Sequence, residues 1–292
     1  MADLVLTAQD FRILDGLRVS PRKSFSGRVR GERLTKKKGV SIEFDDYREY
    51  SDGDDLRHLD WNVFARLDHS VIKTYRDEED LAVHIVLDAS ASMSFGEPQK
   101  IECGKGIACA IGYVALCGGD AVYPSLITAA RTAPVVLRGR VGYHRLAAWA
   151  NGASPVGKAS LASSLRSFAT SQARPGMAVL ITDALDPEIC PSIRILAGRG
   201  HEVWVLQVLA DFELRPDLEG DLRLIDSETA ANVEITANSM TLREYTSRLR
   251  AHNEKISEEC LRAGGRYALV ESGFSVEQTV REVFRKKGWF AA

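Results

Sequence analysis

Residues 83–95 read VHIVLDASASMSF and decide how the rest of the chain is interpreted. The apolar half of this stretch predicts a buried strand that ends at Asp88. Small hydroxyl residues then follow at every second position, as Ser90, Ser92 and Ser94. A serine-rich turn leading into the next helix is one interpretation of this pattern. A cation site, with the carboxylate and the hydroxyl oxygens as ligands, is the other.

The composition indicates an ordinary globular protein. The chain has 292 residues, 45% of them hydrophobic and 27% charged, which suits one large domain or a domain with an appendage. A formal net charge of -2 provides no overall attraction to nucleic acid or to a membrane surface. The five cysteines include no CxxC pair, so we expect free, mostly buried thiols in a reducing compartment.

Targeting segments are not expected. The first residues, MADLVLTAQDFRILDGL, lack the basic-then-apolar order of a signal peptide. The longest apolar run, Gly106 to Cys117, is too short for a membrane-spanning helix, which needs about 20 residues. The sequence therefore predicts a cytoplasmic protein without a membrane partner.

From Leu81 onward, apolar strand patterns alternate with helical patterns, which predicts an α/β fold with a doubly wound, mostly parallel sheet. The predicted strands are Ala82–Leu87, Ala121–Ile127, Pro134–Leu137, Ala178–Ile181, Val203–Leu209, Leu222–Ile225 and Tyr267–Val270. The predicted helices are Lys100–Cys117, Tyr143–Ala150, Leu161–Gln172, Pro187–Ala197, Met240–Ala263 and Val276–Phe284. Several strands are apolar throughout, as expected for a sheet that is covered on both faces. We expect an irregular N-terminal extension over residues 1–80 and the α/β domain over residues 81–292.

Charges are unevenly distributed near the N-terminus. Residues 18–38 hold nine lysines or arginines and one acid, and residues 41–60 hold eight acids and two arginines. A basic arm can bind nucleic acid, but this one lacks interleaved aromatic residues. Partial pairing with the acidic segment, or simple solvation, is the favoured interpretation, so a nucleic-acid partner is not expected.

Familiar enzyme motifs are missing or incomplete. The segment Gly152 to Ala159 approaches the phosphate-loop pattern GxxxxGK[ST], but Ala159 supplies no hydroxyl for magnesium and the preceding segment is helical in pattern. The sequence contains neither a GxSxG nor an HExxH motif, and no histidine directly follows Asp88 or Asp183. We therefore expect a protein that is not an enzyme.

A second carboxylate is predicted beside the first. Asp183 follows the apolar run in VLITDAL, and the carboxyl ends of parallel strands meet at one edge of a sheet. Asp88, Ser90, Ser92 and Asp183 would then offer hard oxygen ligands, which suit Mg²⁺, Ca²⁺ or Mn²⁺ better than Zn²⁺. Because the hydroxyls are neutral, a cation held by them stays electrophilic and can take an acidic side chain of another protein as a further ligand.

The chain resembles a known family at these positions. Asp88-x-Ser90-x-Ser92, followed by LITD, is similar to the metal-ion-dependent adhesion site of von Willebrand factor A domains. The block from Arg48 to Trp61, with its GDDxRxxDW core, resembles the signature of the bacterial DUF58 family. Further matching features are Asp211-x-Glu213-Leu-x-Pro216 and Leu224-Ile-Asp226-x-Glu228-Thr229, and the similarity covers roughly residues 30–290.

The resemblance implies a von Willebrand A-like fold and a MoxR-type AAA+ ATPase as partner, in protein complex assembly or maturation. The sequence differs from the adhesion-site pattern at one position, because Ala159 stands where the adhesion site has a threonine. Ser160 is one residue away from that position, and Lys158 brings a positive charge close to any cation. A weakened cation site is therefore expected. Lys158 itself is an alternative source of positive charge for an acidic partner residue.

The signature residues Asp54, Asp55, Arg57, Asp60 and Trp61 allow two interpretations. They form an active centre, or they form a structural network in which arginine–carboxylate pairs fix an irregular segment and Trp61 is its apolar anchor. The structural interpretation is favoured, and it predicts that deletion of residues 40–75 destabilises the whole domain.

Three functions are compatible with these features. The leading hypothesis is a non-enzymatic protein-interaction module that binds an acidic client or an AAA+ partner at the strand ends. A metal-dependent hydrolase at the same edge is the enzymatic alternative. Nucleic-acid binding through residues 18–38 is the third.

Overall fold

The chain forms two compact units. The structure, a computed structural model, describes residues 5–23, 43–51, 54, 56, 59–76, 80–128, 135–155, 164, 165, 168, 174–225 and 231–291. One unit comprises Met1–Phe25 with Leu81–Ala292, and the other comprises Ser26–Asp80. We call the first the α/β unit and the second the inserted unit, and each is described by itself.

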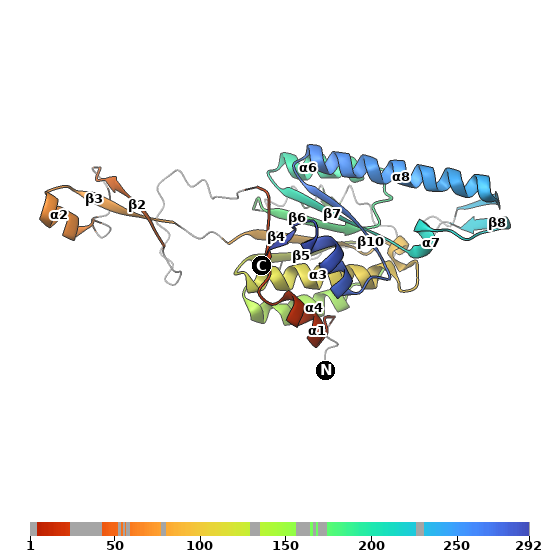
Figure 1. Cartoon of the computed structure of the whole chain (residues 1–292), viewed down its shortest axis with the longest axis horizontal. Coiled ribbons are helices and arrows are strands. Elements are labelled where there is room, and N and C mark those ends of the chain that lie inside the picture. Colours follow the sequence, from red (N-terminus) through yellow and green to blue (C-terminus); the bar gives the residue numbers. More distant parts are fainter. Residues whose placement is uncertain are drawn as a thin grey trace. The chain divides into compact units, whose positions relative to one another are not determined.

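A five-stranded parallel sheet forms the centre of the α/β unit, which confirms the predicted fold class (Figure 1). The spatial order is β10-β7-β6-β4-β5, where β4 is Ala82–Asp88, β5 Ala121–Ile127, β6 Met177–Thr182, β7 Glu202–Leu209 and β10 Arg266–Glu271. The sheet starts with β4, steps outward to β5, and then returns to the other side of β4 as β6. This reversal of direction between β4 and β6 is the place where open α/β sheets collect their ligands.

The strands are buried because helices cover both faces of the sheet. Every residue of β4, β6 and β7 is buried. In Figure 1, α6 (Ile189–Gly198) and α8 (Ser239–Arg262) lie on one side of the sheet, and α3 (Lys100–Cys117) and α4 (Tyr143–Asn151) lie on the other. Continuous apolar runs are the expected sequence pattern for strands in this position.

Helix α3 is packed so closely that two of its glycines are needed. A Cβ atom on Gly112 would stand 2.3 Å from Leu146 Cδ2 of α4 and 3.1 Å from Ile85 Cδ1 of β4. A Cβ atom on Gly104 would stand 2.9 Å from Leu87 Cδ1. The absence of side chains at these two positions lets α3 approach both its sheet and its neighbouring helix.

Several predicted elements differ from the structure. The run Leu222–Ile225 belongs to β8 (Gly220–Ile225), which pairs with β9 (Asn232–Ala237) in a separate antiparallel hairpin and does not join the main sheet. In the described part of the Pro134–Leu137 run, residues 135–137, Leu137 forms an isolated bridge to Val122 and no strand is present. Most of the predicted helix Leu161–Gln172 lies outside the described residues. Helix α8 begins at Ser239, one residue before the predicted start, and its N-cap is Asn238.

The N-terminal residues correct the predicted division at residue 80. Leu6, just before helix α1 (Ala8–Leu14), and Leu14, its last residue, are buried in the core on the α3 side, and β1 (Arg18–Val19) pairs with β11 (Phe290–Ala291). The buried carboxylate of Glu202 accepts hydrogen bonds of 2.7 Å from the backbone of both Arg22 and Lys23. Residues Met1–Phe25 therefore belong to the α/β unit and not to an irregular extension.

The remaining elements complete the two units. In the α/β unit they are η2 (Ala91–Ser94), η3 (Arg140–Gly142), α7 (Asp211–Leu214), α9 (Val276–Thr279) and the π-helical segment η4 (Val280–Arg285). The inserted unit holds an antiparallel hairpin of β2 (Glu43–Glu49) and β3 (Val71–Arg76), with helix α2 (Trp61–Leu67) between them in sequence. Within the described part of the chain, no helix is both long enough and apolar enough to span a bilayer.

Candidate functional site at the carboxyl ends of β4 and β6

The end of β4 and the end of β6 bring the predicted residues together. In the parallel register Leu87 lies opposite Ile181, so Asp88 and Thr182 are the next residues on two adjacent strands. The Thr182 hydroxyl donates a hydrogen bond of 2.6 Å to Asp88 Oδ2. Asp183 follows directly. We call the cluster of Asp88, Ser90, Ser92, Thr182 and Asp183 the rim site.

Asp88 is a buried carboxylate with few hydrogen-bond donors. Its Oδ1 accepts a bond of 2.9 Å from the backbone N–H of Ser90, and its Oδ2 accepts the Thr182 hydroxyl. Burial raises the pKa of Asp88, and the nearby charge of Asp183 raises it further, against the opposing effect of the Thr182 hydrogen bond. A cation beside Asp88 would relieve this cost of holding a buried negative charge.

The alternating serines separate into two groups. Ser90 Oγ and Ser92 Oγ lie 3.0 Å apart, on the loop and the short helix η2 that follow β4. The Ser94 hydroxyl instead donates to the carbonyl of Ala91 over 2.7 Å and is exposed. Met93, between them, is completely buried and fixes the loop to the core. Only the first two hydroxyls therefore belong to the rim site.

Asp183 has a partner that the sequence did not predict. Lys100, the first residue of α3, is completely buried, and its Nζ lies 2.9 Å from Asp183 Oδ2 and 2.8 Å from Glu213 Oε1 of α7. The Gln207 side chain also donates to the backbone carbonyl of Asp183 over 2.9 Å. The rim site therefore includes an internal ammonium group and a third carboxylate.

Two of these additional residues left a trace in the sequence. Lys100 is a basic residue at the start of a helix that is otherwise apolar nearly all round, and a buried charge at such a place requires a partner. Glu213 lies in the Asp211-x-Glu213-Leu-x-Pro216 feature. Thr182 belongs to the LITD motif, although its bond to Asp88 was not predicted. Gln207 gave no comparable signal, because a polar residue inside an apolar strand does not disclose its partner. Lys158, Ala159 and Ser160 lie outside the described residues.

The chemistry of the rim site suits a hard cation. Asp88, Ser90 and Ser92 offer a carboxylate and two hydroxyls whose oxygens are gathered at one place. Mg²⁺, Ca²⁺ and Mn²⁺ prefer oxygen ligands of this type. Among the described residues, no group of three or more histidine, cysteine, aspartate or glutamate side chains has a metal-binding arrangement, so a cation here would depend on the serine hydroxyls. These three oxygen ligands fit such an ion, and Asp88 is the charged one among them.

The region carrying these residues matches a known family. A model of the family described as "Protein of unknown function DUF58" matches residues 46–255, which is more than half of the chain. The chain belongs to the DUF58 family. It is 29% identical over 250 residues to the uncharacterized protein Rv1480 of Mycobacterium tuberculosis (strain ATCC 25618 / H37Rv), with 82% of this chain and 78% of that protein covered. The uncharacterized protein Mb1516 of Mycobacterium bovis matches to the same extent.

Two solved structures are also similar to this DUF58 protein. One is the conserved hypothetical protein BatB from Bacteroides thetaiotaomicron, with 17% identity, a TM-score of 0.41, and coverage of 71% of this chain and 98% of that chain. The other is an aerotolerance-related membrane protein from Bacteroides fragilis, with 18% identity, a TM-score of 0.42, and coverage of 70% and 99%.

Within the inserted unit, the signature residues lie in a network of polar contacts. Arg48 forms a bidentate pair with Asp54 at 2.7 and 2.5 Å, which lowers the pKa of Asp54. Asp60 is the N-cap of α2 and accepts from the backbone of Asn62 and the hydroxyl of Tyr47. Asp55 and Arg57 lie outside the described residues.

Trp61 is not the buried anchor that the structural interpretation expected. Its side chain is 59% exposed and makes an edge contact with Phe64. It is the first residue of α2, a seven-residue helix in which no residue is buried. A short helix on a two-stranded hairpin cannot enclose a side chain of this size.

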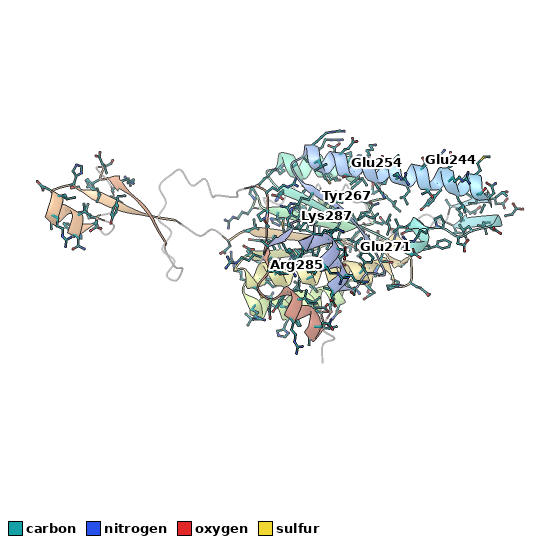
Figure 2. The ribbon with its side chains drawn as sticks, in the orientation of Figure 1. Glu244, Glu254, Tyr267, Glu271, Arg285 and Lys287 are labelled. Atoms are coloured by element: carbon teal, nitrogen blue, oxygen red, sulfur yellow. The ribbon has the colours of Figure 1, made fainter. Side chains whose placement is uncertain are left out.

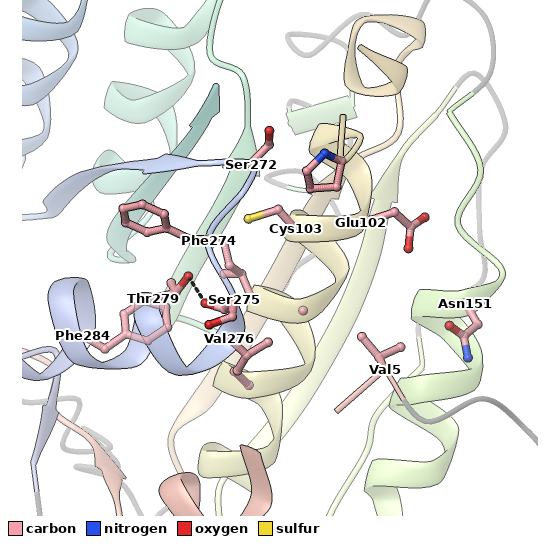
Figure 3. A pocket seen from close by; sticks show the side chains of 14 residues that line it. Val5, Glu102, Cys103, Asn151, Ser272, Phe274, Ser275, Val276, Thr279 and Phe284 are labelled. Atoms are coloured by element: carbon pink, nitrogen blue, oxygen red, sulfur yellow. Dashed lines mark hydrogen bonds between the residues drawn. The ribbon is translucent and has the colours of Figure 1, made fainter. Parts of the chain in front are cut away.

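The cavity in Figure 3 is lined by none of the rim-site residues. It has a volume of 470 Å³ and lies between α3 and α9, with Glu102, Cys103, Phe274 and Val276 among its lining residues. Burial raises the pKa of Cys103 to about 12, so its thiol is protonated and unreactive at neutral pH. Glu102 is paired with Lys105 at 2.8 Å. Cys103 is therefore not an activated nucleophile of this cavity.

Proposed function

We propose that this DUF58 protein is a non-enzymatic protein-interaction module whose contact site is the rim site. The observation that carries the proposal is the convergence of Asp88 with the paired hydroxyls of Ser90 and Ser92 at the point where the strand order reverses. A von Willebrand A-like adhesion site, weakened by Ala159, has these residue types in this place. Asp88, Ser90 and Ser92 would hold the cation, which supplies an electrophilic centre for a partner's carboxylate.

Exposed apolar side chains next to the rim site support a protein partner. Phe95 is 46% exposed, Leu185 45% and Phe212 44%, and they lie on the segments that follow β4, β6 and β7. The rings of Phe95 and Phe212 are 6.3 Å apart. Apolar surface around a small polar centre is typical of protein interfaces. We infer a partner segment with an acidic residue beside apolar ones.

The partner class is inferred from the family. The resemblance to DUF58 proteins points to a MoxR-type AAA+ ATPase, or to an acidic client that such an ATPase remodels during complex assembly or maturation. The same rim offers little to a hydrolase. His252 of α8 is close by, but its Nε2 is bonded at 2.8 Å to the carbonyl of Ala184, so that nitrogen does not activate a serine hydroxyl.

Two variants from the same loop, one of an aspartate and one of a serine, test the proposal. Binding of the purified MoxR-type ATPase would be measured by interferometry with and without Mg²⁺, for the parent, Asp88→Ala and Ser94→Ala. We expect Asp88→Ala to lose at least about tenfold in affinity, since it removes the charged ligand, while Ser94→Ala stays within about twofold because its hydroxyl faces Ala91. Equal binding by the parent and by folded Asp88→Ala would refute the proposal.

A further inference from the structure

Lys100 is the feature of the α/β unit that the proposed function does not use. Its side chain is completely buried, yet it carries an ammonium group. That group is 2.9 Å from Asp183 Oδ2, 2.8 Å from Glu213 Oε1 and 5.9 Å from the centre of the Phe95 ring. A charge this deeply buried is tolerated only when it is paired and hydrogen-bonded. The pairing therefore fixes the position of the ammonium.

Both carboxylates are held in place by other contacts. Asp183 Oδ1 accepts the backbone N–H of Leu185 at 3.3 Å. Glu213 Oε2 accepts the backbone N–H of Ala210 at 2.8 Å, and the Glu213 carbonyl accepts the hydroxyl of Tyr245 at 2.9 Å. The end of α7 is held further by Arg215, which pairs at 2.6 Å with Glu271 at the end of β10. Glu271 is labelled in Figure 2. The ammonium and its two partners thus form a rigid set at the edge of the rim site.

The charges of this set act on anything that enters the rim site. Asp88, Asp183 and Glu213 contribute three negative charges, and Lys100 neutralises one of them. A divalent cation beside Asp88 is attracted by the carboxylates and repelled by the ammonium, and in a buried site each such interaction is only weakly screened. Without Lys100, Asp183 would present its full negative charge to the cation. The Lys100 ammonium offsets part of that charge.

We propose that Lys100 sets the cation affinity of the rim site: its ammonium is a built-in cation that pairs with Asp183 and Glu213 and offsets one of their two negative charges, so that the site keeps its shape without metal and binds a divalent ion weakly. This inference rests on the proposed function and deepens it. Lys100 is a positioning residue in this account, since it holds two carboxylates and does not touch the partner.

Two substitutions change the charge of the set in opposite directions. Lys100→Met removes the positive charge and leaves three carboxylates, so Mn²⁺ affinity should rise at least about tenfold. Glu213→Gln removes a negative charge, so that the Lys100 ammonium is paired with Asp183 alone. Mn²⁺ affinity should therefore fall at least about threefold. A purely structural role for this set would lower the affinity in both variants. Lys105→Met on the same helix, whose lysine pairs with Glu102, is the matched control and should keep the parent affinity.

The experiment is a calorimetric titration of each full-length variant with Mn²⁺ alone, with thermal unfolding recorded with and without the metal. We also expect Lys100→Met to be less stable than the parent without metal and to regain stability when Mn²⁺ is added, because the cation replaces the lost ammonium. An undetectable parent affinity together with measurable binding by Lys100→Met also supports the inference. Equal or weaker binding by folded Lys100→Met overturns it. If Lys100→Met does not fold, the inference is overturned when Glu213→Gln binds Mn²⁺ as tightly as the parent or more tightly.

A final control separates this inference from the proposed function. Adding Asp88→Ala to Lys100→Met should abolish the gained Mn²⁺ binding, because the cation is held beside Asp88. If the gain persists in the double variant, the metal binds elsewhere and the inference fails. Partner binding by the parent and by Asp88→Ala is measured independently, so either result stands without the other.

Discussion

At the scale of single residues, the chemistry of the rim depends on groups that are buried with few partners. Asp88 has two hydrogen-bond donors, Ser90 and Ser92 face each other, and Lys100 fills the space between two carboxylates. The serine and aspartate types were visible in the sequence, because their order after an apolar run is unusual. Lys100 was not identified, since only the packing of α3 against the strand ends brings it to Asp183.

His84, inside β4, gives a residue-scale prediction about pH. Its Nε2 is bonded to the carbonyl of Arg174, and burial, with a smaller contribution from His201, lowers the pKa of His84 to about 4. The unfolded chain then binds more protons than the folded one between pH 6.5 and about 4, so stability is present above this range and is lost as the pH falls. The loss attributable to His84 is on the order of 3 kcal/mol.

Urea unfolding of the parent and of His84→Phe at several pH values measures this contribution. The free energy of unfolding of the variant should decline less between pH 6.5 and 4 than that of the parent. The difference between the two proteins removes the opposing effect of carboxyls such as Asp120, whose pKa burial raises to about 6. The exposed His144→Phe should keep the parent slope. Parallel curves for the parent and His84→Phe would show that His84 is not neutral and buried.

At the scale of elements, the strands of the main sheet were predictable from the sequence, but the sheet that a further strand joins was not. The runs that became β4, β5, β6, β7 and β10 are apolar and bounded by turn residues, so their pattern alone predicts buried strands. Leu222–Ile225, apolar except for Arg223, also predicts a strand, but it pairs with β9 in a hairpin where most of its side chains are exposed. Local pattern indicates a strand in both cases, and only tertiary contacts decide which sheet it joins.

Helix α3 gives the element-scale prediction. Gly112→Ala would place a methyl group 2.3 Å from Leu146 Cδ2, so the buried Leu146 side chain or α4 itself must shift, and we expect a loss of about 1–3 kcal/mol in the free energy of unfolding. Gly198→Ala, at the end of α6 with no atom within 4 Å of the new Cβ, is the matched control and should be neutral or slightly stabilising. Chemical denaturation of the two variants checks this, and equal stability would mean that α3 does not pack as described.

At the scale of the whole molecule, the sequence placed a boundary near residue 80 and missed the one near residue 25. Residues 1–25 carry ordinary surface-helix patterns, and nothing in them discloses that β1 pairs with β11 at the other end of the chain. The strongly charged composition of residues 18–60 favoured the interpretation of this region as an N-terminal extension. The structure instead shows an inserted unit, Ser26–Asp80, between two parts of one α/β unit.

The division into two units revises the expectation for a deletion. The sequence predicted that loss of residues 40–75 destabilises the whole domain. Because the α/β unit has its own core, we now expect that replacing residues 26–80 with a flexible linker of about 12 residues leaves it folded, with a cooperative thermal transition within a few degrees of the parent's. A molten or aggregated product, judged by circular dichroism and gel filtration, would contradict the separation of the units.

If the ends of β4 and β6 form one oxygen-lined cation site, anomalous diffraction from crystals grown with Mn²⁺ will locate the ion there. We expect an anomalous peak within about 2.0–2.6 Å of the Ser90 and Ser92 hydroxyl oxygens and next to Asp88, in the span of bond lengths that hard cations make to oxygen. A crystal saturated with Mn²⁺ in which the ion binds only elsewhere, or in which Asp88 turns away from the two serines, would contradict it.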